Sequence, residues 1–208
     1  MFQPELFSAP SAAGDPSFDD GFRDQERIQL DPRSWVDYQR EWVRRSPALF
    51  EAIRDGRPWS QRTRVLFDKE VLEPRLTAPW SRASGLPLEP PLLEELRLAL
   101  SARYGVEFDS LGYNYYRDGQ DSVAWHRDHI RREIREPVVA LVSLGEPRKL
   151  LLRPRGGGTS KSFTMGPGDL LVTGGLAQRE WEHTIPKVAR AGPRISLAFR
   201  HGLRLPAY

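Results

Sequence analysis

The chain has 208 residues, of which 39% are hydrophobic, and its formal net charge is +3. This length favours one domain, and the absence of cysteine excludes disulfides, cysteine nucleophiles and thiolate metal sites. No apolar run reaches the roughly 18 residues of a membrane span, and the first residues lack the features of a secretory signal. We therefore expect a cytoplasmic protein that does not bind a membrane.

The chain begins with a segment, residues 1–27, that is rich in Pro, Ser, Gly and Asp and shows no periodicity. This composition predicts an irregular arm, followed by a single domain over residues 28–208. A helix is expected next, because Asp31 suits an N-cap and Pro32 suits the first turn. That helix would end near Arg45. Its apolar residues at helical spacing are Trp35, Tyr38, Trp42 and Val43.

The middle of the chain predicts a short strand, a loop and a second helix. Arg64–Phe67 is typical of a strand, and residues 74–91 hold so many prolines that we expect a loop. The second helix starts near Pro90 and runs to Tyr104, with leucines at its apolar positions. Gly105 follows at the place of a C-cap glycine.

Beyond residue 105 the hydrophobic period changes to that of short β-strands. The predicted strands are Leu111–Arg117, Val138–Leu144, Lys149–Arg153, Leu170–Thr173 and Arg194–Phe199. Glycine-rich turns separate these runs, a pattern that is typical of an antiparallel sandwich or barrel. The expected fold class is therefore α+β and mainly β, with the helices first and an antiparallel β-rich core after them.

Three residues have the identity and spacing of a metal site. His126 and Asp128 are two positions apart, so on a strand both side chains would point to the same face. His183 lies on a later segment that a sandwich can bring beside them. Two histidines and one carboxylate form the facial triad of non-haem iron(II) oxygenases, and zinc accepts the same ligands. The alternative is a chance His-x-Asp pair without a metal.

The last predicted strand carries two arginines on one of its faces. Arg194, Ser196 and Arg200 share that face, while the apolar Ile195 and Leu197 lie on the other. An arginine inside a sandwich needs an anionic partner, and a guanidinium pairs with a carboxylate through two parallel hydrogen bonds. A bound dicarboxylate would meet that need. An exposed edge strand with solvated arginines is the alternative.

Basic residues crowd the segment between positions 127 and 161. They are Arg127, Arg131, Arg132, Arg135, Arg148, Lys149, Arg153, Arg155 and Lys161. A basic patch on one face favours a polyanion such as nucleic acid, and a solvated surface is the alternative. The part from Arg148 onward predicts a basic hairpin around a glycine triplet, which could follow a phosphate backbone.

Taken together, these blocks resemble the AlkB family of nucleic-acid dealkylases. Asn114–Gly119 resembles the family's Asn-x-Tyr-x-x-Gly block, and His126–Asp128 occupies the metal position. Gly168–Gly175 matches the strand before the second histidine, and Arg194–Arg200 matches the family's two-arginine block. The phrase Asp121–His126 is most similar to the branch that prefers single strands.

The resemblance covers roughly residues 60–202 and implies a double-stranded β-helix, or jelly-roll, core at about residues 106–202. It implies that His126, Asp128 and His183 bind iron(II). The chain would then be an Fe(II)- and 2-oxoglutarate-dependent dioxygenase, with O2 as the second cosubstrate.

The same resemblance assigns residues to the cosubstrate. Asn114 and Tyr116 would hydrogen-bond 2-oxoglutarate, and Arg194 would pair with its distal carboxylate. Arg200 would act as a catalytic residue that supports the cosubstrate or the reacting centre. Ser196 stands beside the cosubstrate, where the family has an asparagine.

The implied reaction is oxidative demethylation of bases such as 1-methyladenine and 3-methylcytosine in DNA, with release of formaldehyde as a direct-reversal repair. Single-stranded DNA is the favoured partner, RNA is also possible, and no protein partner is implied. Two alternatives stay open. One is the same iron chemistry on RNA, a protein or a small molecule, and the other is a non-catalytic nucleic-acid-binding jelly roll.

The sequence departs from the family around the substrate. Residues 81–85 lack the aromatic side chains of the segment that holds the flipped base, which leaves Trp80 as the candidate for stacking on it. His129 stands where relatives have an acidic residue after the metal aspartate. The other candidate substrate residues are Arg127, Arg148 and Lys149.

Overall fold

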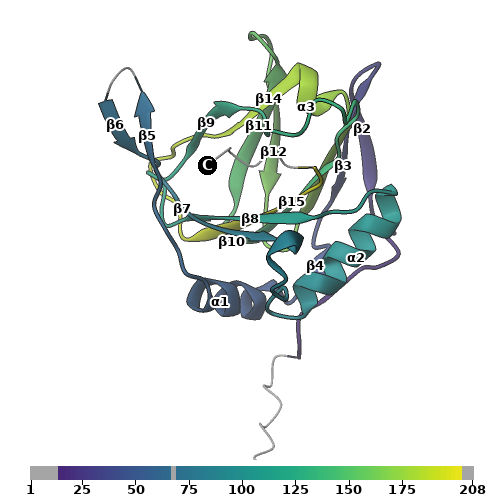
Figure 1. Cartoon of the computed structure of the whole chain (residues 1–208), viewed down its shortest axis with the longest axis vertical. Helices are drawn as coiled ribbons and strands as arrows, with labels where there is room; N and C mark the ends of the chain where they lie inside the picture. The colour runs from purple at the N-terminus through teal and green to yellow at the C-terminus, as the bar shows by residue number, and fades with distance from the viewer. Residues whose placement is uncertain (1–13, 67–68, 203–208) are drawn as a thin grey trace, which may run out of the picture.

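The computed structural model describes residues 14–66 and 69–202, which form two facing β-sheets with the two longer helices on one side (Figure 1). Across the larger sheet the strands are β2 (Glu26–Asp31), β3 (Ser34–Gln39), β13 (Leu170–Gly175), β10 (Val139–Gly145), β15 (Arg194–Arg200), β8 (Ser110–Tyr116) and β7 (Leu76–Ser81). Across the smaller sheet they are β12 (Lys161–Met165), β11 (Arg148–Pro154), β14 (Trp181–Ile185) and β9 (Val123–His126). Neighbouring strands are antiparallel throughout, which confirms the predicted jelly-roll class.

The remaining elements surround the two sheets. Two small pairs are β1 (Ser17–Phe18) with β4 (Val43–Arg44), and β5 (Thr63–Leu66) with β6 (Lys69–Leu72). The helices are α1 (Ser46–Gly56), α2 (Leu92–Tyr104), the short α3 (Ala177–Glu180) and a 3-10 turn at Arg82–Ser84. In the part of the chain that the structure describes, no helix is both long and apolar enough to cross a membrane.

Helices α1 and α2 cover the outer face of the larger sheet (Figure 1). There the apolar side of β15, which is Ile195, Leu197 and Phe199, is fully buried against helix residues such as Leu49 and Leu96. This outer core leaves the opposite side of β15 facing the space between the sheets. The arginines of β15 therefore point inward, and the edge-strand alternative is excluded.

The inner core fills part of the space between the two sheets. It contains Leu150, Leu152, Phe163, Met165, Leu171 and Trp181. Tyr116 belongs to this cluster and borders the arginine face of β15, where Tyr116 pairs with Arg194 in register. The apolar filling thus stops where the polar residues of β8 and β15 begin.

The helix predicted after Asp31 is wrong. Residues 26–39 form the β2–β3 hairpin, and Asp31 closes its turn by accepting a hydrogen bond from the backbone N–H of Arg33 at 2.8 Å. Strand β3 is buried on both faces, with Val36 in the inner core and Trp35 packed on the outer core. A strand that is buried on both sides loses the alternation of apolar and polar residues. The spacing of its aromatic residues therefore resembled that of a helix.

The irregular arm predicted for residues 1–27 needs correction from residue 14 onward. Strand β1 pairs with β4, and Phe22 packs on Trp42 in the outer core, with 5.5 Å between ring centroids. The rest of that prediction, residues 1–13, lies outside the described residues.

In the middle of the chain, the predicted helix and strand are confirmed and the predicted loop is partly wrong. Helix α2 ends at Tyr104, and the next residue, Gly105, has the left-handed φ of 65° expected of a C-cap glycine. Strand β5 covers the described part of Arg64–Phe67. The proline-rich loop contains strand β7, because β7 lies at the edge of its sheet and an edge strand tolerates Pro79.

Candidate active site

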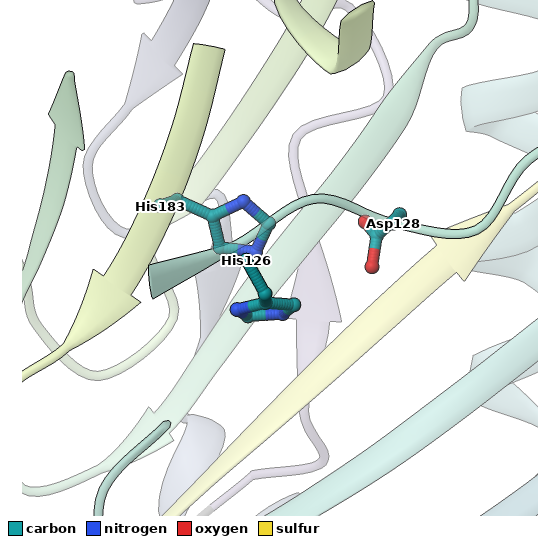
Figure 2. A group of neighbouring side chains, drawn as sticks. All are labelled: His126, Asp128 and His183. Atoms are coloured by element: carbon teal, nitrogen blue, oxygen red, sulfur yellow. The ribbon is translucent and has the colours of Figure 1, made fainter. Parts of the chain in front are cut away.

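His126, Asp128 and His183 meet between the two sheets. One possible ligand atom from each lies within 4.8 Å of the other two, and the two imidazole centroids are 4.2 Å apart. Figure 2 shows the three side chains around a common point, with His126 from β9, His183 from β14 and Asp128 from the segment after β9. The predicted convergence of these residues is therefore present in the structure.

The inward direction of His126 depends on an irregularity in β9 that the sequence did not reveal. His126 pairs with His183, but Val123 pairs with Ile185, so β9 has one more residue than β14 between the two pairs. Such a bulge turns both Val123 and His126 inward despite their odd spacing. Asp128 lies beyond the end of β9, so the expectation of two ligands on one strand is wrong, although both reach the site.

Two contacts of Arg153 on the outside of the smaller sheet stabilise this bulge. Arg153 of β11 pairs with Glu182 of β14, with 2.6 Å between Nε and Oε1. The same guanidinium lies 3.9 Å from the ring centroid of Trp125, inside the bulge of β9. A cation–π contact and an ion pair thus connect the three strands behind both histidines.

Arg200 pairs with the metal aspartate rather than standing free in the cavity. Its Nη2 is 2.9 Å from Oδ1 of Asp128, and both side chains are largely buried. Burial by itself would raise the pKa of Asp128, but the charge of Arg200 and its hydrogen bond to the carboxylate hold that pKa below its ordinary value. The other oxygen, Oδ2, has no hydrogen-bond partner among the described residues, which leaves a charged atom for a cation.

The two histidines are held in the neutral form that binds metals. Burial, and next the neighbouring His126, lower the pKa of His183 to about 3. Burial also lowers the pKa of His126, whose Nδ1 lies 2.9 Å from the carbonyl oxygen of Ala124. Neutral imidazoles beside an ionised carboxylate fit a divalent metal such as iron(II).

The metal-free protein should lose stability as the pH falls from about 6.5 toward 3. The lowered pKa of His183 means that the unfolded chain takes up a proton in this window while the folded protein does not. The stability is complete above the unfolded pKa and declines below it. Urea unfolding at pH 7, 6 and 5 measures the slope, which the variant His183→Gln should reduce. Equal slopes in the two proteins would contradict this assignment.

A buried cation lies at the cosubstrate end of the inner space. Arg194 is 1% exposed, and its Nε donates a hydrogen bond of 2.9 Å to Oγ of Ser143. Its guanidinium carbon is 5.3 Å from the ring centroid of Tyr116. Nη1 has no hydrogen-bond partner among the described residues, and burial lowers the pKa of Arg194 to about 10. A buried donor without a partner fits an anionic ligand such as the distal carboxylate of 2-oxoglutarate.

Asn114 and Ser196 face each other in register beside this cation, as the resemblance implies for residues around the cosubstrate. Oδ1 of Asn114 accepts a hydrogen bond of 3.1 Å from Nε of Arg75, and Arg75 also pairs with Glu73 at 2.9 Å. Sequence reasoning missed Arg75, because it lies in the segment that was predicted to be a loop. The only feature of the sequence that could have indicated a strand beside Arg75 is the alternation that starts at Leu76.

Two of the predicted substrate residues do not reach the site. Trp80 packs against the outer core, and its indole N–H donates to the carbonyl oxygen of Leu86 at 2.8 Å. Arg148 is 2% exposed and donates to three backbone carbonyl oxygens, those of Asp118, Asp121 and Pro186. Trp80 therefore faces away from the metal ligands, and Arg148 is a structural residue that no phosphate can reach.

The other three predicted substrate residues lie nearer the surface. Nη1 of Arg127 donates to the carbonyl oxygen of Arg179 at 3.0 Å, which gives this arginine a structural contact. His129 is exposed one position after the metal aspartate, and Lys149 is exposed on β11. Their roles toward a substrate stay predictions.

A facial triad with a buried cation beside it, inside a jelly roll, defines the site of a non-haem iron oxygenase that binds an anionic cosubstrate. Comparisons with known proteins agree. The model of the 2OG-Fe(II) oxygenase superfamily matches residues 38–200. Alpha-ketoglutarate-dependent dioxygenase alkB homolog 3 of Bos taurus is 32% identical over 177 residues, covering 76% of this chain and 62% of that protein.

Two further relatives extend the comparison. DNA oxidative demethylase ALKBH2 of Arabidopsis thaliana is 30% identical over 205 residues, covering 80% of this chain and 63% of that protein. The solved structure of OsALKBH1 matches 85% of this chain and 100% of its own with a TM-score of 0.60, at 15% identity, which supports the fold alone. The match thus spans 62% and 63% of the length of these two curated relatives, which is less than two thirds of either.

The chain belongs to the 2OG-Fe(II) oxygenase superfamily and, within it, to the AlkB family. Proteins of this superfamily use iron(II), 2-oxoglutarate and O2, and the His126, Asp128 and His183 triad can form the iron site.

Proposed function

We propose that the protein removes methyl groups from N-methylated bases of the 1-methyladenine and 3-methylcytosine type in single-stranded DNA, with release of formaldehyde. The observation that carries this proposal is the convergence of the His126, Asp128 and His183 side chains in one inner space. The names of the relatives, among them a DNA oxidative demethylase, support nucleic acid as the substrate.

When held by His126, Asp128, His183 and Arg194, iron(II) and 2-oxoglutarate would supply the hydroxylation of the methyl carbon by O2, with succinate and carbon dioxide as the co-products. The hydroxymethyl group then leaves the base nitrogen as formaldehyde. The protein's residues hold and orient the reactants. Arg194 would pair with the distal carboxylate beside Tyr116, and Arg200 keeps Asp128 ionised and aimed at the metal position.

A basic segment next to the triad supports a polyanionic substrate. Directly after Asp128 the chain exposes Arg131, Arg132 and Arg135. Arg179 fixes this segment, because its guanidinium donates to the carbonyl oxygens of Ile130, Arg131 and Ile134 at 3.3, 2.6 and 2.6 Å. Phosphates could bind these exposed guanidinium groups while a base reaches the metal.

The choice of single strands rests on the energy of exposing a base. A methyl group at these ring nitrogens blocks Watson–Crick pairing, and an unpaired base is cheaper to move out of its stack than a paired one. Trp80, which was predicted to stack on the base, packs on the outer core instead.

The test compares oligonucleotides under identical conditions. The protein is loaded anaerobically with iron(II) and 2-oxoglutarate, given air and a single-stranded DNA containing 3-methylcytosine, and assayed for formaldehyde and succinate. We expect equal amounts of both products with the methylated DNA and neither above background with the unmethylated strand. The matched control is His126→Ala, which should form neither product.

Other outcomes would reject the proposal in favour of a specific alternative. Formaldehyde from methylated RNA but not from DNA would assign the same chemistry to RNA. Succinate formation that only proteins or small molecules stimulate would move the substrate outside nucleic acids. DNA binding without succinate, unchanged in His126→Ala, would leave a non-catalytic binding module.

A further inference from the structure

Gly112 lies in the middle of strand β8, on the inward face that also carries Asn114. Its φ is not among the positive values of the described glycines, so its backbone conformation is open to any residue. A glycine inside a strand weakens the strand, and its usual reason there is a close approach by another group. The group that approaches Gly112 cannot be identified from the sequence.

The approaching group is the guanidinium of Arg200. A Cβ atom at position 112 would lie 2.6 Å from Nη1 of Arg200, well inside van der Waals contact. Gly112 pairs in register with Ala198, two residues before Arg200 on the neighbouring strand, so the arginine side chain folds back over the bare backbone of β8. Nη1 also points toward the carbonyl oxygen of Ala198, at 3.4 Å.

The other nitrogen of the same guanidinium carries the ion pair with the metal ligand. Nη2 of Arg200 is 2.9 Å from Oδ1 of Asp128, and the arginine side chain is only 15% exposed. A planar guanidinium that is pushed away from β8 moves Nη2 together with Nη1, because both are fixed in one plane. The position of the metal ligand is therefore coupled to the absence of a side chain at position 112.

We infer that Gly112 is a positioning residue of the iron site: its missing side chain lets Arg200 lie against β8 and hold Asp128 with the second oxygen turned to the metal. This inference rests on the iron site of the proposed function. It does not depend on the nature of the substrate, and metal binding can be measured without any nucleic acid.

The variant Gly112→Ala should bind a divalent metal about 10- to 100-fold more weakly, which is the usual effect of disturbing a group that supports a metal ligand. Anaerobic titration with Mn(II), followed by electron paramagnetic resonance of the free ion, measures the affinity without turnover. Gly56→Ala is the matched control, because no atom lies within 4 Å of a Cβ there. This control should bind Mn(II) as the unchanged protein does.

A double-mutant cycle separates positioning from a general loss of packing. Arg200→Lys should weaken Mn(II) binding by itself, because it loses the contact of Nη2 with Asp128. It also lacks the Nη1 atom that would collide with a Cβ at position 112, so Gly112→Ala added to it should cause no further loss. Thermal unfolding of each metal-free variant shows whether the fold is kept.

Three results have distinct meanings. Equal Mn(II) affinity in Gly112→Ala and the unchanged protein would overturn the inference. A loss on Gly112→Ala that is just as large in the Arg200→Lys background would also overturn it, since the glycine would then act without the arginine. Absence of Mn(II) binding to the unchanged protein would instead reject the iron site, and with it the proposed function.

Discussion

Replacement of Arg194 by methionine is expected to raise the KM for 2-oxoglutarate by at least about a hundredfold, because breaking a buried ion pair by removing one partner costs about 3–5 kcal/mol. Arg194 is fully buried, and its Nη1, which has no hydrogen-bond partner in the described part of the chain, is available to an anion. Methionine fills similar space without the charge. Succinate formation at increasing 2-oxoglutarate concentration gives the KM.

The stability of the metal-free Arg194→Met protein should not fall, because the substitution removes a buried cation that burial disfavours. Arg148→Met is the matched control, since Arg148 is also buried but already donates to three carbonyl oxygens. Arg148→Met should lower the melting temperature, because these three carbonyl oxygens lose their hydrogen-bond donor. An unchanged KM in Arg194→Met would remove Arg194 from the cosubstrate site.

Replacement of His183 by alanine is expected to abolish iron binding and turnover together. Disturbance of a group behind a metal ligand weakens affinity by about 10- to 100-fold, so loss of a ligand itself should exceed that range. Retention of the charge-transfer band of the iron(II)–2-oxoglutarate complex in His183→Ala would contradict the site.

The control for this variant is the histidine at position 201. His201 accepts a hydrogen bond of 3.0 Å from the backbone N–H of Val138 and is not a member of the triad. Glutamine can keep that acceptor, so His201→Gln should bind iron(II) as the unchanged protein does. Loss of binding in both variants would indicate a general effect on folding.

The sequence was sufficient for those parts of the site whose residues obey strand alternation. Arg194, Ser196 and Arg200 were placed on one face by a period of two, and the structure has them facing inward opposite a fully apolar side. The three residues predicted to bind the metal converge in the structure, but the geometry expected for them is wrong. The bulge in β9, and the position of Asp128 beyond the end of that strand, cannot be inferred from the spacing of His126 and Asp128.

Errors arose where tertiary contacts override local patterns. Strand β3 looked like a helix because Val36 is buried on one face and Trp35 packs against the outer core on the other. Arg148 looked like a surface cation, yet it is one of the most buried polar residues of the molecule, because the carbonyl oxygens that surround it come from two distant loops. Such partners are set by topology and cannot be inferred from neighbours in the sequence.

The contacts of α3 have a consequence for the thermodynamics of metal uptake. Gln178 and Arg179 lie in α3, shortly before His183 in the chain. Gln178 accepts a hydrogen bond from the backbone N–H of Asp128, and Arg179 donates to the carbonyl oxygens of Ile130, Arg131 and Ile134. These hydrogen bonds join the segments that carry two of the three ligands, and none of them uses a ligand atom of the triad. Little conformational entropy remains to be lost on binding, so the affinity of this centre should reflect ligand chemistry rather than the ordering of a loop.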